Sequence, residues 1–97
     1  MLAITRRVDQ WVQIGQSISV SPTDIDEKSV RLIARGRIIG GPEDGAAFEK
    51  TAEVGVGGEM RLGEHVVVSV LAISGDEVRL GIQSPKHVRV DRKERAT

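Results

Sequence analysis

Short apolar runs, some alternating with polar residues and some wholly apolar, follow one another along the chain. They are rich in Val and Ile and are separated by Gly, Asp, Ser and Pro. Runs of this length and composition predict β-strands, and no segment has a convincing helical spacing of apolar residues. The runs are MLAITRRV (1–8), WVQIG (11–15), SISVS (17–21), SVRLIARG (29–36), EMRLG (59–63), HVVVSVLAIS (65–74), EVRLGI (77–82) and HVRVD (87–91). The chain is therefore predicted to be mostly β.

The sequence also repeats itself weakly at an offset of 48 residues. Without a gap, this offset aligns Gly15 with Gly63 and the tripeptide Val-Arg-Leu at 30–32 with that at 78–80. Such self-similarity is typical of a duplicated unit. We predict one domain, 1–97, built from two tandem repeats, 1–48 and 49–97. The alternative is a chance alignment of two Val-rich stretches.

Charge is balanced overall but unevenly distributed. The 97 residues hold 14 Lys and Arg and 14 Asp and Glu, which taken alone argues against nucleic-acid binding. However, segments 1–8 and 85–97 together carry a net charge of +5, so the middle of the chain carries −5. The two ends are therefore candidates for binding a polyanion.

Several classes of function find little support in the composition. There is no Cys, and two His residues, His65 and His87, are too few for a convincing metal site. No stretch approaches the roughly 20 apolar residues needed to cross a bilayer, and the N-terminus lacks the apolar core of a signal peptide. No nucleophile–base pair or set of convergent acids can be assembled. We expect a cytoplasmic protein that has no cofactor, makes no membrane contact and is not an enzyme.

Two stretches carry a family resemblance. MLAITRRVDQWVQIG resembles the start of the carbon storage regulator family (CsrA/RsmA), and EMRLGEHVVVSVLAISGDEVRLGIQSPKHVRVDRKE resembles the rest of it. Members are small bacterial RNA-binding translational regulators that look like interlocked homodimers with five short strands per chain. In them the first strand of one subunit lies beside the fifth of the other, so each RNA site spans two chains.

For this chain the resemblance implies CsrA-like interlocked antiparallel sheets, folded as a single-chain pseudo-dimer of two five-stranded repeats. The first and last strands would pair and form one complete RNA site. The other combination, 49–56 with 37–44, has lost basic residues: Val54 and Gly55 stand opposite Arg6 and Arg7, and Asp44 stands opposite Arg92. We expect no RNA there, because acidic residues repel phosphate. The alternative is a homodimer in which 43–58 is only an insertion.

The resemblance places the RNA site at both ends of the chain. The candidate residues are Ile4, Thr5, Arg6, Arg7, Ser84, Pro85, Lys86, His87, Val88, Val90 and Arg92. Strand alternation turns Ile4 and Arg6 to one face and Thr5 and Arg7 to the other, and the resemblance favours Ile4 and Arg6 for RNA contact. One alternative is that the arginine pair only protects an edge strand from pairing with another chain. The other is that 84–92 is an ordinary solvent-exposed strand that carries basic side chains.

Within 84–92, Pro85 cannot donate a ladder hydrogen bond and so predicts either the start of a strand or an edge strand. Lys86 and Arg92 would attract phosphate. Asp91 departs from the family, where a histidine commonly precedes the arginine; its charge would weaken binding or orient Arg92.

The resemblance implies that the protein binds GGA-containing hairpin loops in mRNA leaders or small regulatory RNAs and blocks translation by steric occlusion. A protein antagonist is a further partner that it allows. The alternative function is a degenerate protein-interaction module that no longer binds RNA.

Overall fold

The computed structural model describes residues 1–93; Glu94 and Arg95, part of the charged C-terminal segment, lie outside the described residues. The described part contains nine strands and no helix, and the prediction of a mostly β chain is confirmed. The strands are β1 (Leu2–Arg7), β2 (Trp11–Ile14), β3 (Ile18–Ile25), β4 (Ser29–Arg37), β5 (Ala47–Gly55), β6 (Glu59–Leu62), β7 (Val66–Ser74), β8 (Glu77–Gln83) and β9 (Val90–Lys93). None of the described residues forms a helix long and apolar enough to cross a bilayer.

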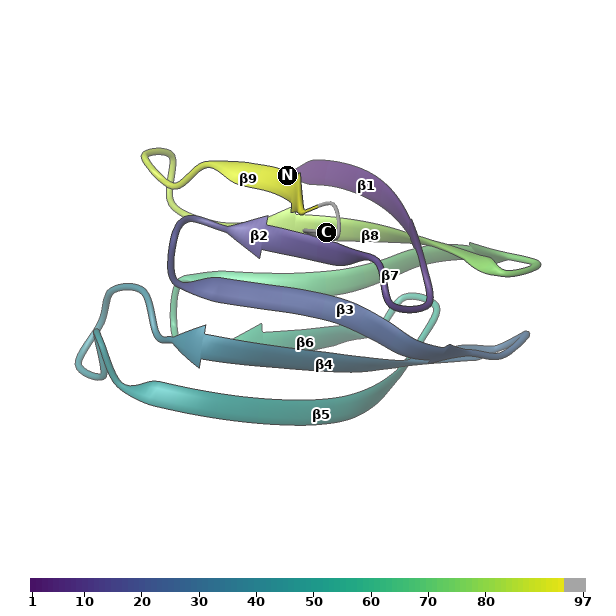
Figure 1. Ribbon diagram of the computed structural model, residues 1–97, viewed down its shortest axis with the longest axis horizontal. Coiled ribbons are helices and arrows are strands. Elements are labelled where there is room, and N and C mark those ends of the chain that lie inside the picture. The colour runs from purple at the N-terminus through teal and green to yellow at the C-terminus, as the bar shows by residue number, and fades with distance from the viewer. Residues whose placement is uncertain (94–97) are drawn as a thin grey trace.

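The strands form two antiparallel sheets, and each sheet takes an outer strand from the other half of the chain (Figure 1). One sheet has the order β1-β8-β7-β6, and the other has the order β5-β4-β3-β2-β9. β1 pairs with β8, with Ile4 opposite Leu80, whereas β9 pairs with β2, with Asp91 opposite Gln13. The two halves are therefore interlocked within one chain, as the resemblance implied.

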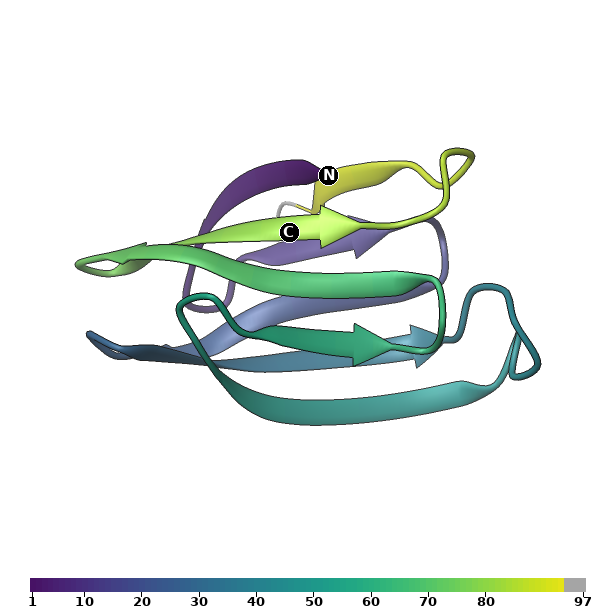
Figure 2. The ribbon, with the colours of Figure 1, turned by 180° about the vertical axis from the view of Figure 1, so that it is seen from behind.

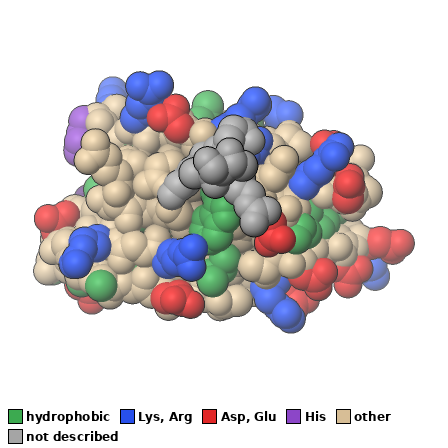
Figure 3. Space-filling view, viewed as in Figure 1, with side chains coloured by type: hydrophobic (Ala, Val, Ile, Leu, Met, Phe, Trp, Pro, Cys, Tyr) green, Lys and Arg blue, Asp and Glu red, His purple; other side chains and the backbone are tan. Residues whose placement is uncertain are grey.

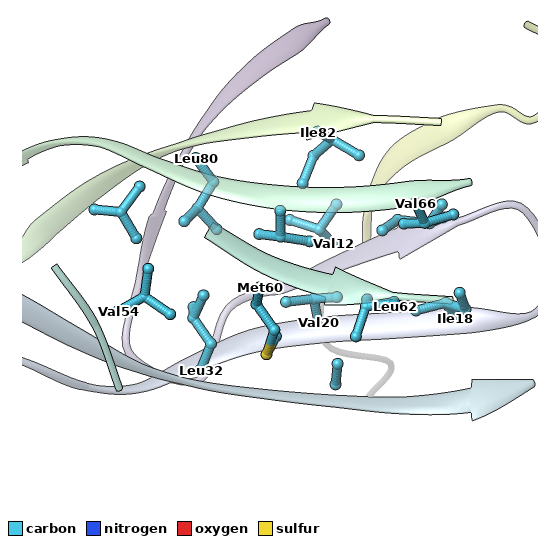
Figure 4. Close-up of a cluster of buried hydrophobic side chains, with 14 of the residues drawn as sticks. Val12, Ile18, Val20, Leu32, Val54, Met60, Leu62, Val66, Leu80 and Ile82 are labelled. Atoms are coloured by element: carbon cyan, nitrogen blue, oxygen red, sulfur yellow. The ribbon is translucent and has the colours of Figure 1, made fainter. Parts of the chain in front are cut away.

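The core fills the space between the two sheets (Figure 4). Val12, Val20 and Leu32 of the five-stranded sheet and Leu62 and Leu80 of the four-stranded sheet are essentially inaccessible to solvent. Strand alternation explains this layer, because every second residue of each strand faces the opposite sheet. Burial of each such side chain contributes roughly 1.5–3 kcal/mol to folding.

The backbone repeats at the same 48-residue offset as the sequence. β2 at 11–14 corresponds to β6 at 59–62, and β3 and β7 begin at the corresponding Ile18 and Val66. The two β-bulges recur as well, between Pro22 and Asp24 in β3 and between Val70 and Ala72 in β7. Such bulges are position-specific features of a strand pair, so the two hairpins share one geometry.

The repeats differ at their ends, since the first contributes four strands where five were predicted. Residues 38–46, where its fifth strand would lie, form a loop. Gly45 N donates to the Ile38 carbonyl at 2.8 Å, and Gly40 N donates to Asp44 Oδ1 at 2.6 Å. Gly40, Gly41 and Gly45 all have positive φ, which an extended strand cannot accommodate.

β5 was missed by the apolar pattern. Its side chains are mostly exposed, and only Val54 is buried. The strand forms because β4 offers it a full ladder, from Ser29 opposite Gly55 to Arg37 opposite Ala47. Tertiary pairing rather than local periodicity decides this element.

Candidate nucleic-acid interface

β1 and β9 adjoin along the upper edge of the molecule, where the start of β1 meets β9, as both views show (Figures 1 and 2). A hollow of about 360 Å³ lies there, lined by Leu2, Ala3, Ile4, Val90, Asp91 and Arg92. The predicted pairing of the first strand with the last is wrong, because they are edge strands of different sheets. Each edge keeps one side of its backbone outside the described ladders, and both edges adjoin the hollow.

The inner face of β1 carries two of the predicted site residues. Ile4 and Arg6 are each only 6% exposed, and Ile4 lies opposite Leu80. Arg6 Nε donates to the Thr5 carbonyl at 2.8 Å and Nη1 donates to the Trp11 carbonyl at 3.3 Å. The predicted alternation is confirmed, but the two residues favoured for RNA contact face inward, and Arg6 fastens β1 to the start of β2.

Arg7, on the outer face, lies at the other end of β1 from the hollow. Its side chain is 57% exposed, and its Nη2 lies 3.3 Å from Glu77 Oε2. Asp76 Oδ2 is 3.9 Å from its Nε. Neither arginine lines the hollow, so Thr5, Arg6 and Arg7 flank this site and do not form its wall.

Residues 84–89 form a turn, although the sequence predicted a strand from Pro85 onward. Val88 N donates to the Pro85 carbonyl at 3.0 Å, and β9 begins only at Val90. Lys86 and His87 are exposed on this turn. Ser84 and Pro85 are half-buried and line a neighbouring hollow with Arg61, Glu64 and His65.

The turn is attached to the β2–β3 hairpin. Gly15 N donates to the Arg89 carbonyl at 2.6 Å, and half-buried Val88 packs close to Gly15. Asp91 Oδ2 lies 2.9 Å from Arg89 Nε in an exposed ion pair, so its charge engages Arg89 and not Arg92 as considered above. The side chain of Arg92 is exposed at the wall of the hollow.

Charge is separated along the surface (Figure 3). Lys and Arg side chains gather along the upper edge, over β9 and β1, whereas acidic side chains gather at the end where the β3–β4 and β7–β8 hairpins project. Those hairpins carry Asp24, Asp26, Glu27, Asp76 and Glu77. A polyanion is therefore attracted to the β9 side of the molecule and repelled from the hairpin tips.

The corresponding position in the other half of the fold has different chemistry. A hollow of about 340 Å³ lies beside β5 and β6, and Ile38, Phe48 and Leu62 supply apolar lining. Glu43 and Glu49 contribute acid to it, alongside Lys50 and Arg61. No strand of the described chain occupies the place that β9 takes beside β2.

Some lining residues were not selected from the sequence. Leu2 and Ala3 belong to the predicted first strand, and this position was the available signal in the sequence. In the structure Leu2 is 45% exposed and both residues line the hollow. Among residues 1–93, no group of three or more His, Cys, Asp or Glu residues could hold a metal ion.

Comparison with known proteins shows that the second half of the chain is similar to one family. Residues 56–96 match the model of the CsrA global regulator protein family. This segment is CsrA-like. The match begins after β5 and does not extend to residues 1–55, so the family motif expected of residues 1–8 stays a prediction. The resemblance seen in the second stretch, residues 59–94, is thereby confirmed.

The curated relatives are named translational regulator CsrA. The protein of Thermotoga maritima is 46% identical over 39 residues, which cover 40% of this chain and 47% of the relative. That of Bacillus subtilis is 46% identical over 35 residues, 36% of this chain and 47% of the relative. That of a Nocardioides species is 58% identical over 33 residues, 34% of this chain and 40% of the relative. The chain thus spans about half the length of the curated relatives it matches, and no solved structure gives a significant match.

Proposed function

We propose that this protein is a non-catalytic, RNA-binding regulator of translation that acts in the cytoplasm. The observation that carries the proposal is the meeting of β1 and β9, from opposite ends of the chain, at one hollow with exposed Arg92 in its wall. The CsrA-family match of 56–96 supports the same function, since the relatives are named translational regulators.

The RNA is a single-stranded hairpin loop containing GGA. Bases in such a loop are unstacked, so their edges can meet backbone N–H and C=O groups on the free sides of β1 and β9. Leu2 and Ala3 offer apolar contact in the hollow, and Arg92 and Lys86 attract phosphate. Arg6 acts as a brace for β1, and Ile4 supports the floor from the core. Binding to a leader then occludes the ribosome-binding region.

Each chain holds one such site. The recurrence of strands and bulges at the 48-residue offset supports a duplicated origin with repeats 1–48 and 49–97. In the first repeat the loop 38–46 replaces the fifth strand, and Asp44 stands where the second repeat has Arg92. The β5 side therefore lacks counterparts of both β9 and Arg92.

Native mass spectrometry with two hairpins, one displaying GGA and one CCA in the loop, tests the proposal. We expect one RNA per chain, with clear preference for GGA. Arg92→Ala should weaken this complex, whereas Arg79→Ala should not, since Arg79 is an exposed arginine on β8 and is not among the residues that line the β1–β9 hollow. Absence of any RNA complex at low salt would overturn the proposal in favour of a protein-interaction module.

A further inference from the structure

The four-stranded sheet ends at β6 without a further strand. Its counterpart in the other repeat, β2, lies between β3 and β9, whereas β6 pairs only with β7 among the described residues. Figure 2 shows β6 as the lowest strand of the sheet that faces the viewer. A strand that is interior in one repeat is thus an edge in the other, and edges of this kind are sites for pairing with another chain.

The register of β2 identifies which groups of β6 face this edge. Gln13 lies opposite Asp91, and Gly15 N donates to the Arg89 carbonyl, so Gln13 and Gly15 direct their backbone groups toward β9. At the 48-residue offset these positions are Arg61 and Gly63, and Glu59 precedes them at the same spacing. The Arg61 carbonyl is reached there at 3.1 Å by the Nζ of exposed Lys50, a flexible group that can move aside.

The side chains of β6 are complementary to those of a second β6. Met60 and Leu62 point into the core, while Glu59 and Arg61 are exposed on the outer face, where Arg61 Nη2 lies 3.0 Å from Glu59 Oε1. In an antiparallel pair centred on Met60, Glu59 of each copy stands opposite Arg61 of the other. A shift of two residues toward Glu59 or Arg61 places that residue opposite itself instead, and like charges directly opposite destabilise a pair.

We propose that two copies of this chain associate through their β6 edges about a two-fold axis at Met60. The same positions, Glu59 and Arg61, supply both the outward backbone groups and the opposed charges, so the register that satisfies one also satisfies the other. The result is one continuous eight-stranded sheet with an isologous interface. β1 lies at the opposite edge of the four-stranded sheet, so the hollow between β1 and β9 stays open in both copies. This association does not depend on the proposed RNA function.

Sedimentation velocity of the full chain, over a concentration series reaching the millimolar range, tests the pairing. We expect a reversible dimer for the natural sequence. Arg61→Glu places Glu opposite Glu twice and should raise the dimer Kd by about tenfold or more. The double variant Glu59→Arg/Arg61→Glu restores opposed charges and should return the Kd toward that of the natural chain. Arg79→Glu makes the same charge change on an interior strand of the same sheet and should leave the Kd unchanged.

Thermal unfolding of each variant confirms that it is folded before its Kd is compared. The proposal is overturned if the natural chain stays monomeric throughout the series, or if it dimerises with a Kd that Arg61→Glu leaves unchanged. An interlocked homodimer formed by exchange of β1 and β9 would give the second result, because its interface does not include β6. Failure of the double variant to recover would exclude the register centred on Met60.

Discussion

The β1–β9 end and the β5–β6 end of the molecule occupy equivalent places in a repeated fold, yet they offer different surfaces. At the first, two edge strands adjoin a hollow with exposed Arg92, and the basic turn 84–89 leads into β9. At the second, β5 is present, but the loop 38–46 replaces the edge strand that would correspond to β9. This loop carries Glu43 and Asp44. A surface made by two strand edges is therefore lost when one edge strand is lost, even while the core is kept.

A few backbone positions cause this difference between the ends of the two repeats. Gly40, Gly41 and Gly45 turn the chain where the second repeat has the extended Val90 and its neighbours. The core side chains beneath remain matched, as with Ile14 and Leu62, which are both fully buried. Packing therefore constrains the core residues at the centre of each repeat, whereas the backbone at the end of each repeat can differ.

The largest expected effect is at Gly36, where β4 meets the divergent loop. Its φ is +138°, and a Cβ built there would lie 1.8 Å from the Ser17 carbonyl oxygen. Gly36→Ala should destabilise the fold by about 3 kcal/mol, through backbone clash and strain together. Thermal unfolding should show a Tm lower by more than about 10 °C. Gly75→Ala is the control, since its φ is +60° but no atom lies within 4 Å; equal losses for the two would contradict the clash.

The next largest effect is expected on RNA affinity, when the charge at Arg92 or Asp44 is reversed. Arg92→Asp gives the β1–β9 hollow the residue that the first repeat has at Asp44, and RNA affinity should fall by about 30-fold, with the salt dependence of binding weakened by about one phosphate contact. Fluorescence anisotropy over a salt series measures both. The reverse change, Asp44→Arg, should create no second site, because the loop 38–46 supplies no strand edge; two RNAs per chain would refute that explanation.

A smaller effect on stability is expected in the turns that follow β1 and β5. Asp9 has φ of 67°, and Gly57 stands at the equivalent position with φ of 87°. Since glycine adopts positive φ without a Cβ penalty, Asp9→Gly should stabilise the protein by about 0.5–1 kcal/mol. Gly57→Asp should cost a similar amount. Urea unfolding resolves the pair, and a loss of stability in Asp9→Gly would show that the Asp9 side chain holds this turn.

The smallest effect is expected for the exposed ion pair at the end of β1. Arg7 and Glu77 have side chains 57% and 43% exposed, so solvent screens their attraction. Glu77→Gln should change the free energy of unfolding by less than about 0.5 kcal/mol. If a chemical unfolding curve instead gave a change several times larger, this pair would have a structural role comparable with that of buried Arg6.

Apolar spacing alone predicted the strands with strong apolar character, and the 48-residue offset predicted a repeated second half. Alternation placed Ile4 and Arg6 on one face of β1, and both side chains are buried. Local spacing suffices for these features, because side-chain direction in a strand follows from its two-residue period. The motif in the second half of the chain likewise indicated the resemblance to the CsrA family that the match of residues 56–96 bears out.

Contacts between distant parts of the chain set which strands are neighbours and which side chains reach the surface. The weak pattern of β5 became a strand because β4 pairs with it, and the first and last strands proved to be edges of two sheets that meet without pairing. In the folded chain the Arg6 side chain is buried, whereas Arg92 lines the hollow. These outcomes depend on contacts between residues far apart in the chain, and neither periodicity nor residue type in one segment specifies the partner that a strand edge will find.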